Sequence, residues 1–150
     1  MGPRSRRTCT LVLSAVAIAA CGGNDPSLPD ACKRGPAAVR SALRAAPRPV
    51  RLDGVPLSRC VSEASDAGEL QASGASLVGA AGGLAAGARR SPGGADELRL
   101  GYLVGAAARG AGPEGGERSE LLRRLEQEAD ALRQRGAAFR RGLEAGRRDG

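Results

Sequence analysis

The chain has no histidine and no tryptophan, and its 150 residues include one tyrosine and one phenylalanine. Without histidine, the commonest general base and the commonest nitrogen ligand for metals are both missing. No serine lies in a G-x-S-x-G motif, and the glycine-rich stretch 79–87 lacks the Lys-Ser or Lys-Thr pair of a phosphate-binding loop. The composition therefore argues against an enzyme and predicts no metal and no cofactor. Because aromatic residues are almost absent, the core must be built from Leu, Val and Ala.

Positive charge is carried almost entirely by arginine, since Lys33 is the one lysine among 23 basic residues. The whole chain has a net charge of +7, and three of its arginines lie within the first twenty residues. The remaining charges of both signs are mixed along the chain, and no aromatic side chains accompany the arginines. Nucleic-acid binding surfaces combine a one-signed basic field with stacking aromatics. We therefore expect no nucleic-acid partner.

The first twenty residues have the layout of a secretory signal peptide. Arg4, Arg6 and Arg7 form a basic start, and an apolar run of ten residues from Leu11 to Ala20 follows it. As an α-helix, ten residues cover about 15 Å, roughly half of a hydrocarbon core, so the run is too short for a permanent span. We predict that residues 1–20 are a signal peptide.

The apolar run ends in Ile18-Ala19-Ala20-Cys21, which resembles the lipobox of bacterial lipoproteins. The resemblance implies that the chain is cut between Ala20 and Cys21 and that Cys21 receives a diacylglyceryl group. The mature protein would then be lipid-anchored to the cell membrane on its extracytoplasmic face. The alternative is ordinary cleavage after Ala17-Ile18-Ala19. Ser5-Arg6-Arg7 leaves the general and the twin-arginine export routes both open.

The four cysteines are Cys9, Cys21, Cys32 and Cys60. Cys9 would leave with the signal peptide and Cys21 would be acylated, which leaves two cysteines in an oxidising compartment. We therefore predict a Cys32–Cys60 disulfide, with two buried free cysteines as the alternative.

Beyond the cleavage site, residues 21–31 contain Gly, Pro and polar residues without periodicity, as is typical of a flexible tether. Residues 32–150 are expected to form one mostly α domain. We predict a small bundle of about four helices with a short hairpin or turn, stapled by one disulfide. The first helix should begin at Gly35-Pro36 and end before Pro47, because proline suits the first turn of a helix and no later position.

Local motifs predict the next elements. Asp53-Gly54 between two short apolar alternations predicts a hairpin, and Ser58 is the expected N-cap of the helical turn that carries Cys60. Asp66 and Glu69 form an acidic variant of the capping box.

A long helix should follow from this box as far as Arg90. Glycines 79, 83 and 87 lie four residues apart in it and could accept the close approach of another helix, whereas Gly82-Gly83 could instead break it. Ser91-Pro92 is expected to open the next helix, and 110–116 is expected to be a loop.

One last helix is predicted from Glu117 to Arg147, with apolar residues at 3-4 spacing. This seam could pair with a partner protein in the envelope, or it could pack on its own domain, which we favour. Glu126 and Asp130 are expected to pair with arginines rather than to do acid chemistry. The seam consists of Leu122, Leu125, Ala129, Leu132, Gly136, Phe139 and Leu143.

Three strings resemble uncharacterised secreted proteins of high-GC Gram-positive bacteria: 32–36 (Cys-Lys-Arg-Gly-Pro), 57–60 (Leu-Ser-Arg-Cys) and 100–105 (Leu-Gly-Tyr-Leu-Val-Gly). That resemblance implies no activity. We expect a lipid-anchored, non-catalytic binding or interaction module. The alternative is a small extracytoplasmic enzyme that uses carboxylates alone, and two acids converging in a concave pocket would favour it.

Overall fold

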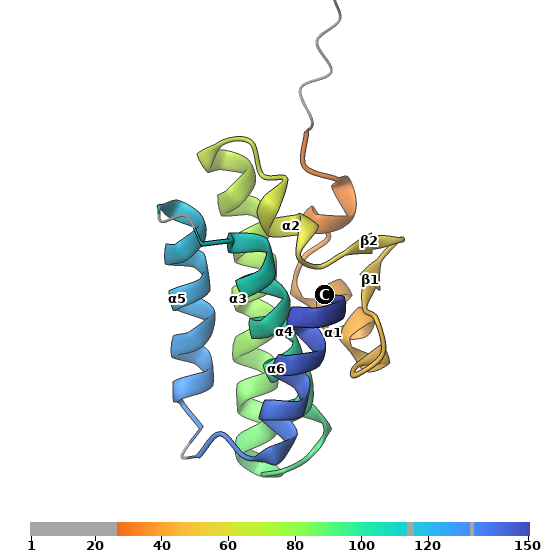
Figure 1. Ribbon diagram of the computed structural model, residues 1–150, viewed down its shortest axis with the longest axis vertical. Coiled ribbons are helices and arrows are strands. Elements are labelled where there is room, and N and C mark those ends of the chain that lie inside the picture. The colour runs from red at the N-terminus through yellow and green to blue at the C-terminus, as the bar shows by residue number, and fades with distance from the viewer. Residues whose placement is uncertain (1–26, 114–115, 133) are drawn as a thin grey trace, which may run out of the picture.

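The computed structural model describes residues 27–113, 116–132 and 134–150 (Figure 1). The predicted signal peptide, the cleavage site at Ala20 and the acylated Cys21 lie outside the described residues. Within them the fold is mostly α-helical with one small hairpin and one disulfide, which confirms the predicted fold class. The described part contains six α-helices where we expected about four.

Four longer helices lie side by side along the long axis of the molecule, and the earlier elements cover their side and one end (Figure 1). Chain direction alternates, so that α3 and α5 run opposite to α4 and α6. The elements are η1 (Asp30–Lys33), α1 (Pro36–Ala42), η2 (Leu43–Ala45), β1 (Arg51–Leu52), β2 (Val55–Pro56), α2 (Arg59–Ser62), α3 (Ala67–Arg90), α4 (Ala95–Ala111), α5 (Glu117–Asp130) and α6 (Ala137–Asp149).

The first helix begins with Pro36 at its first position, as the sequence predicts. Gly35 precedes it with a φ of 85°, a conformation that glycine adopts without strain. The helix passes into η2 and ends before Pro47. Val39 and Leu43 are fully buried and attach this segment to the core.

The hairpin is also confirmed. Asp53 and Gly54 both have positive φ, 46° and 87°, as a type I′ turn requires. The paired strands place Arg51 opposite Pro56 and Leu52 opposite Val55. Leu52 points into the core, where it is 5% exposed.

Ser58 is the N-cap residue of α2, as predicted, but its backbone is already helical and its side chain makes no capping hydrogen bond. Its hydroxyl instead donates to the backbone oxygen of Gly150 at 2.6 Å. Ser58 is buried, and Gly150, directly after α6, supplies a long-range acceptor for its hydroxyl.

Helix α3 starts and ends as predicted. Its N-cap, Asp66, accepts a hydrogen bond from the backbone N–H of Glu69 at 2.9 Å. Helix α3 runs unbroken through Gly82 and Gly83, so the predicted alternative of a break there is wrong. A Cβ at Gly79 would lie 2.6 Å from Pro36, and one at Gly83 would lie 2.7 Å from the Arg40 guanidinium. Two of the spaced glycines therefore accept the close approach of α1.

The expected start of the next helix at Ser91-Pro92 is wrong. The N–H of Ser91 still bonds the Gly87 carbonyl and so ends α3, and Gly94 is the N-cap of α4. Gly93 has a φ of 76°, which makes the turn between the two helices. The turn is held by the carboxylate of Glu97, which accepts from the Gly93 N–H at 2.6 Å.

The single helix predicted from Glu117 to Arg147 is also wrong, because α5 ends at Asp130 and α6 begins at Ala137. The chain reverses between them, and Glu97 stabilises the new helix start. Its carboxylate accepts from the N–H of Gly136 at 2.8 Å and from that of Phe139 at 3.4 Å. Glu97 is only 3% exposed. Its carboxylate thus accepts from backbone N–H groups that have no acceptor within α6, and it lies at the positive end of the α6 dipole.

Helices α4 and α6 run parallel with their backbones in direct contact, which is the closest helix packing in the described chain. Gly101 and Gly105 on α4 face Gly142 and Gly146 on α6. A Cβ at Gly142 would lie 2.8 Å from the backbone nitrogen of Tyr102 and closer still to the Leu98 carbonyl. Side chains larger than hydrogen do not fit at these positions, so both helices need glycine there.

Many residues of α4 are buried in the core, among them Leu100, Tyr102 and Leu103. The Tyr102 hydroxyl accepts a hydrogen bond from the Val50 N–H at 2.9 Å, and burial raises the pKa of this phenol. The predicted C-terminal seam lies largely inside this core, although on two helices. Its buried members are Leu125, Ala129, Leu132 and Phe139.

Candidate functional site

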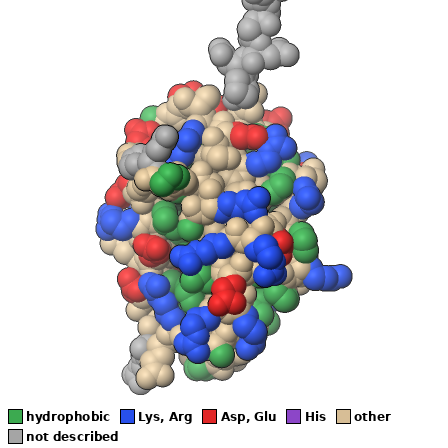
Figure 2. Space-filling model, viewed as in Figure 1, with side chains coloured by type: hydrophobic (Ala, Val, Ile, Leu, Met, Phe, Trp, Pro, Cys, Tyr) green, Lys and Arg blue, Asp and Glu red, His purple; other side chains and the backbone are tan. Residues whose placement is uncertain are grey.

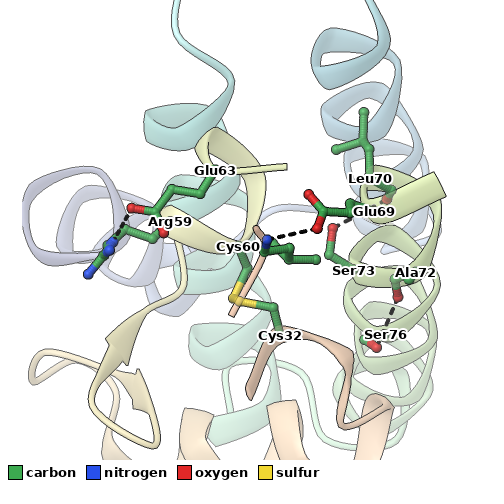
Figure 3. Close-up of a disulfide and its surroundings, with 10 residues drawn as sticks. Cys32, Arg59, Cys60, Glu63, Glu69, Leu70, Ala72, Ser73 and Ser76 are labelled. Atoms are coloured by element: carbon green, nitrogen blue, oxygen red, sulfur yellow. Dashed lines mark hydrogen bonds and ion pairs between the residues drawn. A yellow bond between two sulfur atoms is a disulfide. The ribbon is translucent and has the colours of Figure 1, made fainter. Parts of the chain in front are cut away.

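The predicted disulfide is present and ties the start of the described chain to the helical domain (Figure 3). Cys32 lies in η1 and Cys60 in α2, with their Cα atoms 5.3 Å apart. Both cysteines are buried, at 1% and 0% exposure. The structure thus brings together the two predicted bridge residues and fixes where the chain enters the domain.

A second link fixes the same entry point from the side of α3. The backbone N–H of Leu28 donates to one carboxylate oxygen of Glu69 at 2.9 Å, and Ser65 donates to the other oxygen through its N–H and its hydroxyl. Hydrogen bonds from Ser65 and then Leu28 hold the pKa of Glu69 below its usual value. The bond from the Glu69 N–H to Asp66 is therefore local, whereas the Glu69 carboxylate also bonds Leu28, 41 residues earlier in the chain.

A groove of about 760 Å³ lies between α3 and α5. Its α3 wall is formed mostly by small and apolar residues along one face, at i, i+3, i+7, i+8 and i+11, with Gln71 among them. Leu121 is the apolar residue on the α5 side, and its side chain approaches Gly74. The α3 residues are Ala67, Leu70, Gln71, Gly74, Ala75 and Val78.

One end of the groove lies at the starts of α3 and α5. A smaller hollow of about 230 Å³ shares Leu70 and Glu117 with it and reaches Ser65 and Asp66 before α3. Beside this hollow, Arg118 of α5 donates to the Ala64 carbonyl at 3.0 Å and links the start of α5 to the residues before α3. Figure 1 shows the first turns of α3 and α5 at the same end of the molecule as η1.

On the α5 side the groove is also lined by the charged residues Glu117, Glu120 and Arg124, which we call its rim. Glu120 accepts two hydrogen bonds from Arg123 at 2.8 Å and one from Arg124 at 3.0 Å. These bonds and the two positive charges lower the pKa of Glu120 to about 2. A general acid needs a pKa raised toward neutrality, so Glu120 is shifted in the opposite direction.

The shift of Glu120 predicts how the rim responds to acid. Because its folded pKa of about 2 is below its ordinary value of 4.5, the ionised group stabilises the folded state at pH above 4.5. That contribution is lost as the pH falls toward 2. We expect the Glu120 carboxyl carbon to titrate with a midpoint of about 2 in an NMR series, and the midpoint to rise in R123Q/R124Q. A midpoint near 4.5 in the unmodified protein would contradict the ion-pair geometry.

Other carboxylates on the helices pair with arginines. Asp130 pairs with Arg135, as the sequence predicts for this acid, and Arg135 also lies over the ring of Phe139 at 5.3 Å. Arg59 pairs with Glu63 on α2 (Figure 3). Figure 2 shows basic, acidic and apolar side chains interspersed over the face that it presents. Surface pairs of this kind contribute little to stability.

No three acidic or cysteine side chains gather to hold a metal ion within the residues that the structure describes. None of the helices in those residues combines the length and the apolarity that crossing a bilayer requires. No family model, no curated protein and no solved structure matches the chain.

The groove was missed by sequence reasoning, because it depends on how far apart α3 and α5 lie. Part of its α3 wall, from Gly74 to Val78, lies in a stretch without charged residues, but nothing local distinguishes a face that is covered from one that is open. The structure covers the Gly79 side with α1 and leaves the Ala75 side open.

Proposed function

We propose that this protein is a lipid-anchored cell-envelope protein, held at the extracytoplasmic face of the membrane by lipid on Cys21. The observation that carries the proposal is Ile18-Ala19-Ala20-Cys21 behind a basic start and an apolar run of ten residues. In this proposal residues 1–20 are removed, residues 21–31 form the tether, and the domain over 32–150 faces the exterior.

The cysteine chemistry supports an extracytoplasmic location. Cys32 and Cys60 form a buried disulfide, and structural disulfides belong to oxidising compartments. With Cys9 removed and Cys21 acylated, every mature cysteine has a chemical role. Simple secretion would instead leave Cys21 as an odd thiol.

The groove supports a binding or interaction module rather than a catalyst. Its α3 wall is mostly apolar, and the rim carboxylate of Glu120 is held ionised by two arginines. Much of the predicted C-terminal seam is buried in the domain itself, so a partner would more readily meet the groove than the seam. The proposed role is therefore to bind an apolar ligand or partner at the envelope surface.

Replacing Cys21 tests the proposal. Cells that express the full chain and are fed an alkyne fatty acid should label the wild-type protein, and C21S should lose the label and leave the membrane fraction or stay uncleaved. C9S is the matched control, because Cys9 lies within the same N-terminal segment, and it should label normally. Labelling of C21S at the wild-type level would overturn the lipobox assignment.

A further inference from the structure

We propose that the groove between α3 and α5 holds an acyl chain of the lipid on Cys21 of the same molecule. This inference rests on the proposed function, because it needs Cys21 to be acylated. It adds an occupant for the groove: the domain would fold back on its own anchor instead of hanging freely from it.

The walls of the groove suit a hydrocarbon chain. The α3 wall is mostly apolar, and Leu121 is the apolar residue of the α5 side, beside the charged rim. The α3 residues are Ala67, Leu70, Gln71, Gly74, Ala75 and Val78. Beyond the first turns of α3 and α5, the backbone amides are used in the hydrogen bonds of the helices themselves, so this length of the walls offers an extended peptide nothing to pair with. Charged groups lie on the rim. An unbranched chain without polar atoms leaves no hydrogen bond unmade in such a groove.

The shape of the groove also fits a chain rather than a side chain. From Ala67 to Val78 the apolar face extends for about 16 Å along α3, at 1.5 Å per residue. Three of the residues along it, Ala67, Gly74 and Ala75, have small side chains or none and leave room for a chain to lie on the helix.

The position of the chain entry places Cys21 within reach. Leu28 is held against Glu69 in the first turn of α3, and the next residue, Leu70, already lines the groove. Cys21 precedes Leu28 by seven residues, which span at most about 25 Å when extended. A helix is about 10–12 Å across, so the tether can pass around the start of α3 and deliver the lipid to the mouth of the groove.

Photocrosslinking from the lipid tests this inference. The full chain is produced in a lipid-modifying bacterium fed with a diazirine fatty acid, purified, and reconstituted in phosphatidylethanolamine–phosphatidylglycerol vesicles. After irradiation we expect adducts on peptides covering 67–78 and 117–124. If the label is on Cys21 but the adducts are confined to vesicle lipid or to other peptides, the groove is not the acyl site and the inference fails.

Two matched variants and an isotope mixture sharpen the test. Ala75 and Ala72 are both exposed on α3, but only Ala75 lines the groove. A75R should therefore lose most of the groove adduct, while A72R should keep it. When ¹⁵N-labelled protein without the diazirine is mixed in, the adducts should stay on the ¹⁴N chains, and adducts on ¹⁵N chains would overturn the intramolecular assignment. A lack of label on Cys21 would instead contradict the proposed function.

Discussion

Replacing Gly142 with alanine should destabilise the protein more than any other single methyl group added to its helices. The new Cβ would lie 2.8 Å from the backbone nitrogen of Tyr102 and would collide with the Leu98 carbonyl. These are backbone atoms of α4 and cannot rotate away, so α4 and α6 would have to separate. Overpacking typically costs about 1–3 kcal/mol and occasionally more. We expect at least the upper end, against a total stability of about 5–15 kcal/mol.

Urea denaturation followed by circular dichroism measures this change, and G82A is its control. Gly82 lies in the middle of α3, where a Cβ would make an ordinary 3.4 Å contact with the carboxylate of Glu128. Alanine is favoured over glycine in a helix by about 1 kcal/mol, so G82A should be neutral or stabilising. If G142A unfolds at the same urea concentration as the wild type, the backbone contact between α4 and α6 is not present in solution.

Removing the disulfide should have the second largest effect. The bridge joins residues 28 apart in sequence, and the chain-entropy model gives about 3.5 kcal/mol for closing a loop of this size. Cys60 is completely buried, so C60A also removes a packed sulfur. We expect C60A to lower the free energy of unfolding by a few kcal/mol.

Treatment with a reductant separates the stabilisation that comes from the disulfide bond from that of the packed Cys60 sulfur. Dithiothreitol should destabilise the wild type by most of the C60A effect, since Cys32 and Cys60 then become free to separate in the unfolded chain. The same treatment should leave C60A nearly unchanged. Equal urea midpoints for reduced and oxidised wild-type protein would show that the Cys32–Cys60 bridge does not stabilise the domain.

Elements with short-range signals could be predicted from the sequence. Gly35-Pro36, Asp53-Gly54 and Asp66 each act through neighbours within four residues, and the structure places a helix start, a turn and a cap where they indicate. The disulfide followed from the expected chemistry of the other cysteines, because Cys32 and Cys60 were the pair left over.

Long-range contacts could not be predicted in this way. Glu97 bonds Gly93 locally, but its bonds to Gly136 and Phe139 lie some forty residues away and decide where α6 begins. The Ser58 hydroxyl likewise bonds Gly150, 92 residues later, instead of making the expected capping bond to its own helix. In each case a tertiary contact replaces the partner that local spacing suggests.

The contact between α4 and α6 did leave a sequence signal that our reasoning missed. Gly101 and Gly105 are four residues apart, and so are Gly142 and Gly146. Two such pairs indicate helices that can approach closely, whereas a 3-4 apolar seam indicates one continuous face. We interpreted the apolar seam from Leu122 to Leu143 as one continuous helix. Each half of the seam is apolar because its own helix, α5 or α6, packs into the domain, so the pattern gives no sign of the reversal before Ala137.

The intact mass of the protein extracted from its native envelope under non-reducing conditions tests the central claim most directly. The account predicts the mass of residues 21–150, increased by a diacylglyceryl group with or without a further acyl chain, and reduced by two hydrogens for the Cys32–Cys60 bridge. An unacylated chain that retains Cys21, or one that still carries residues 1–20 in the envelope at steady state, would contradict it.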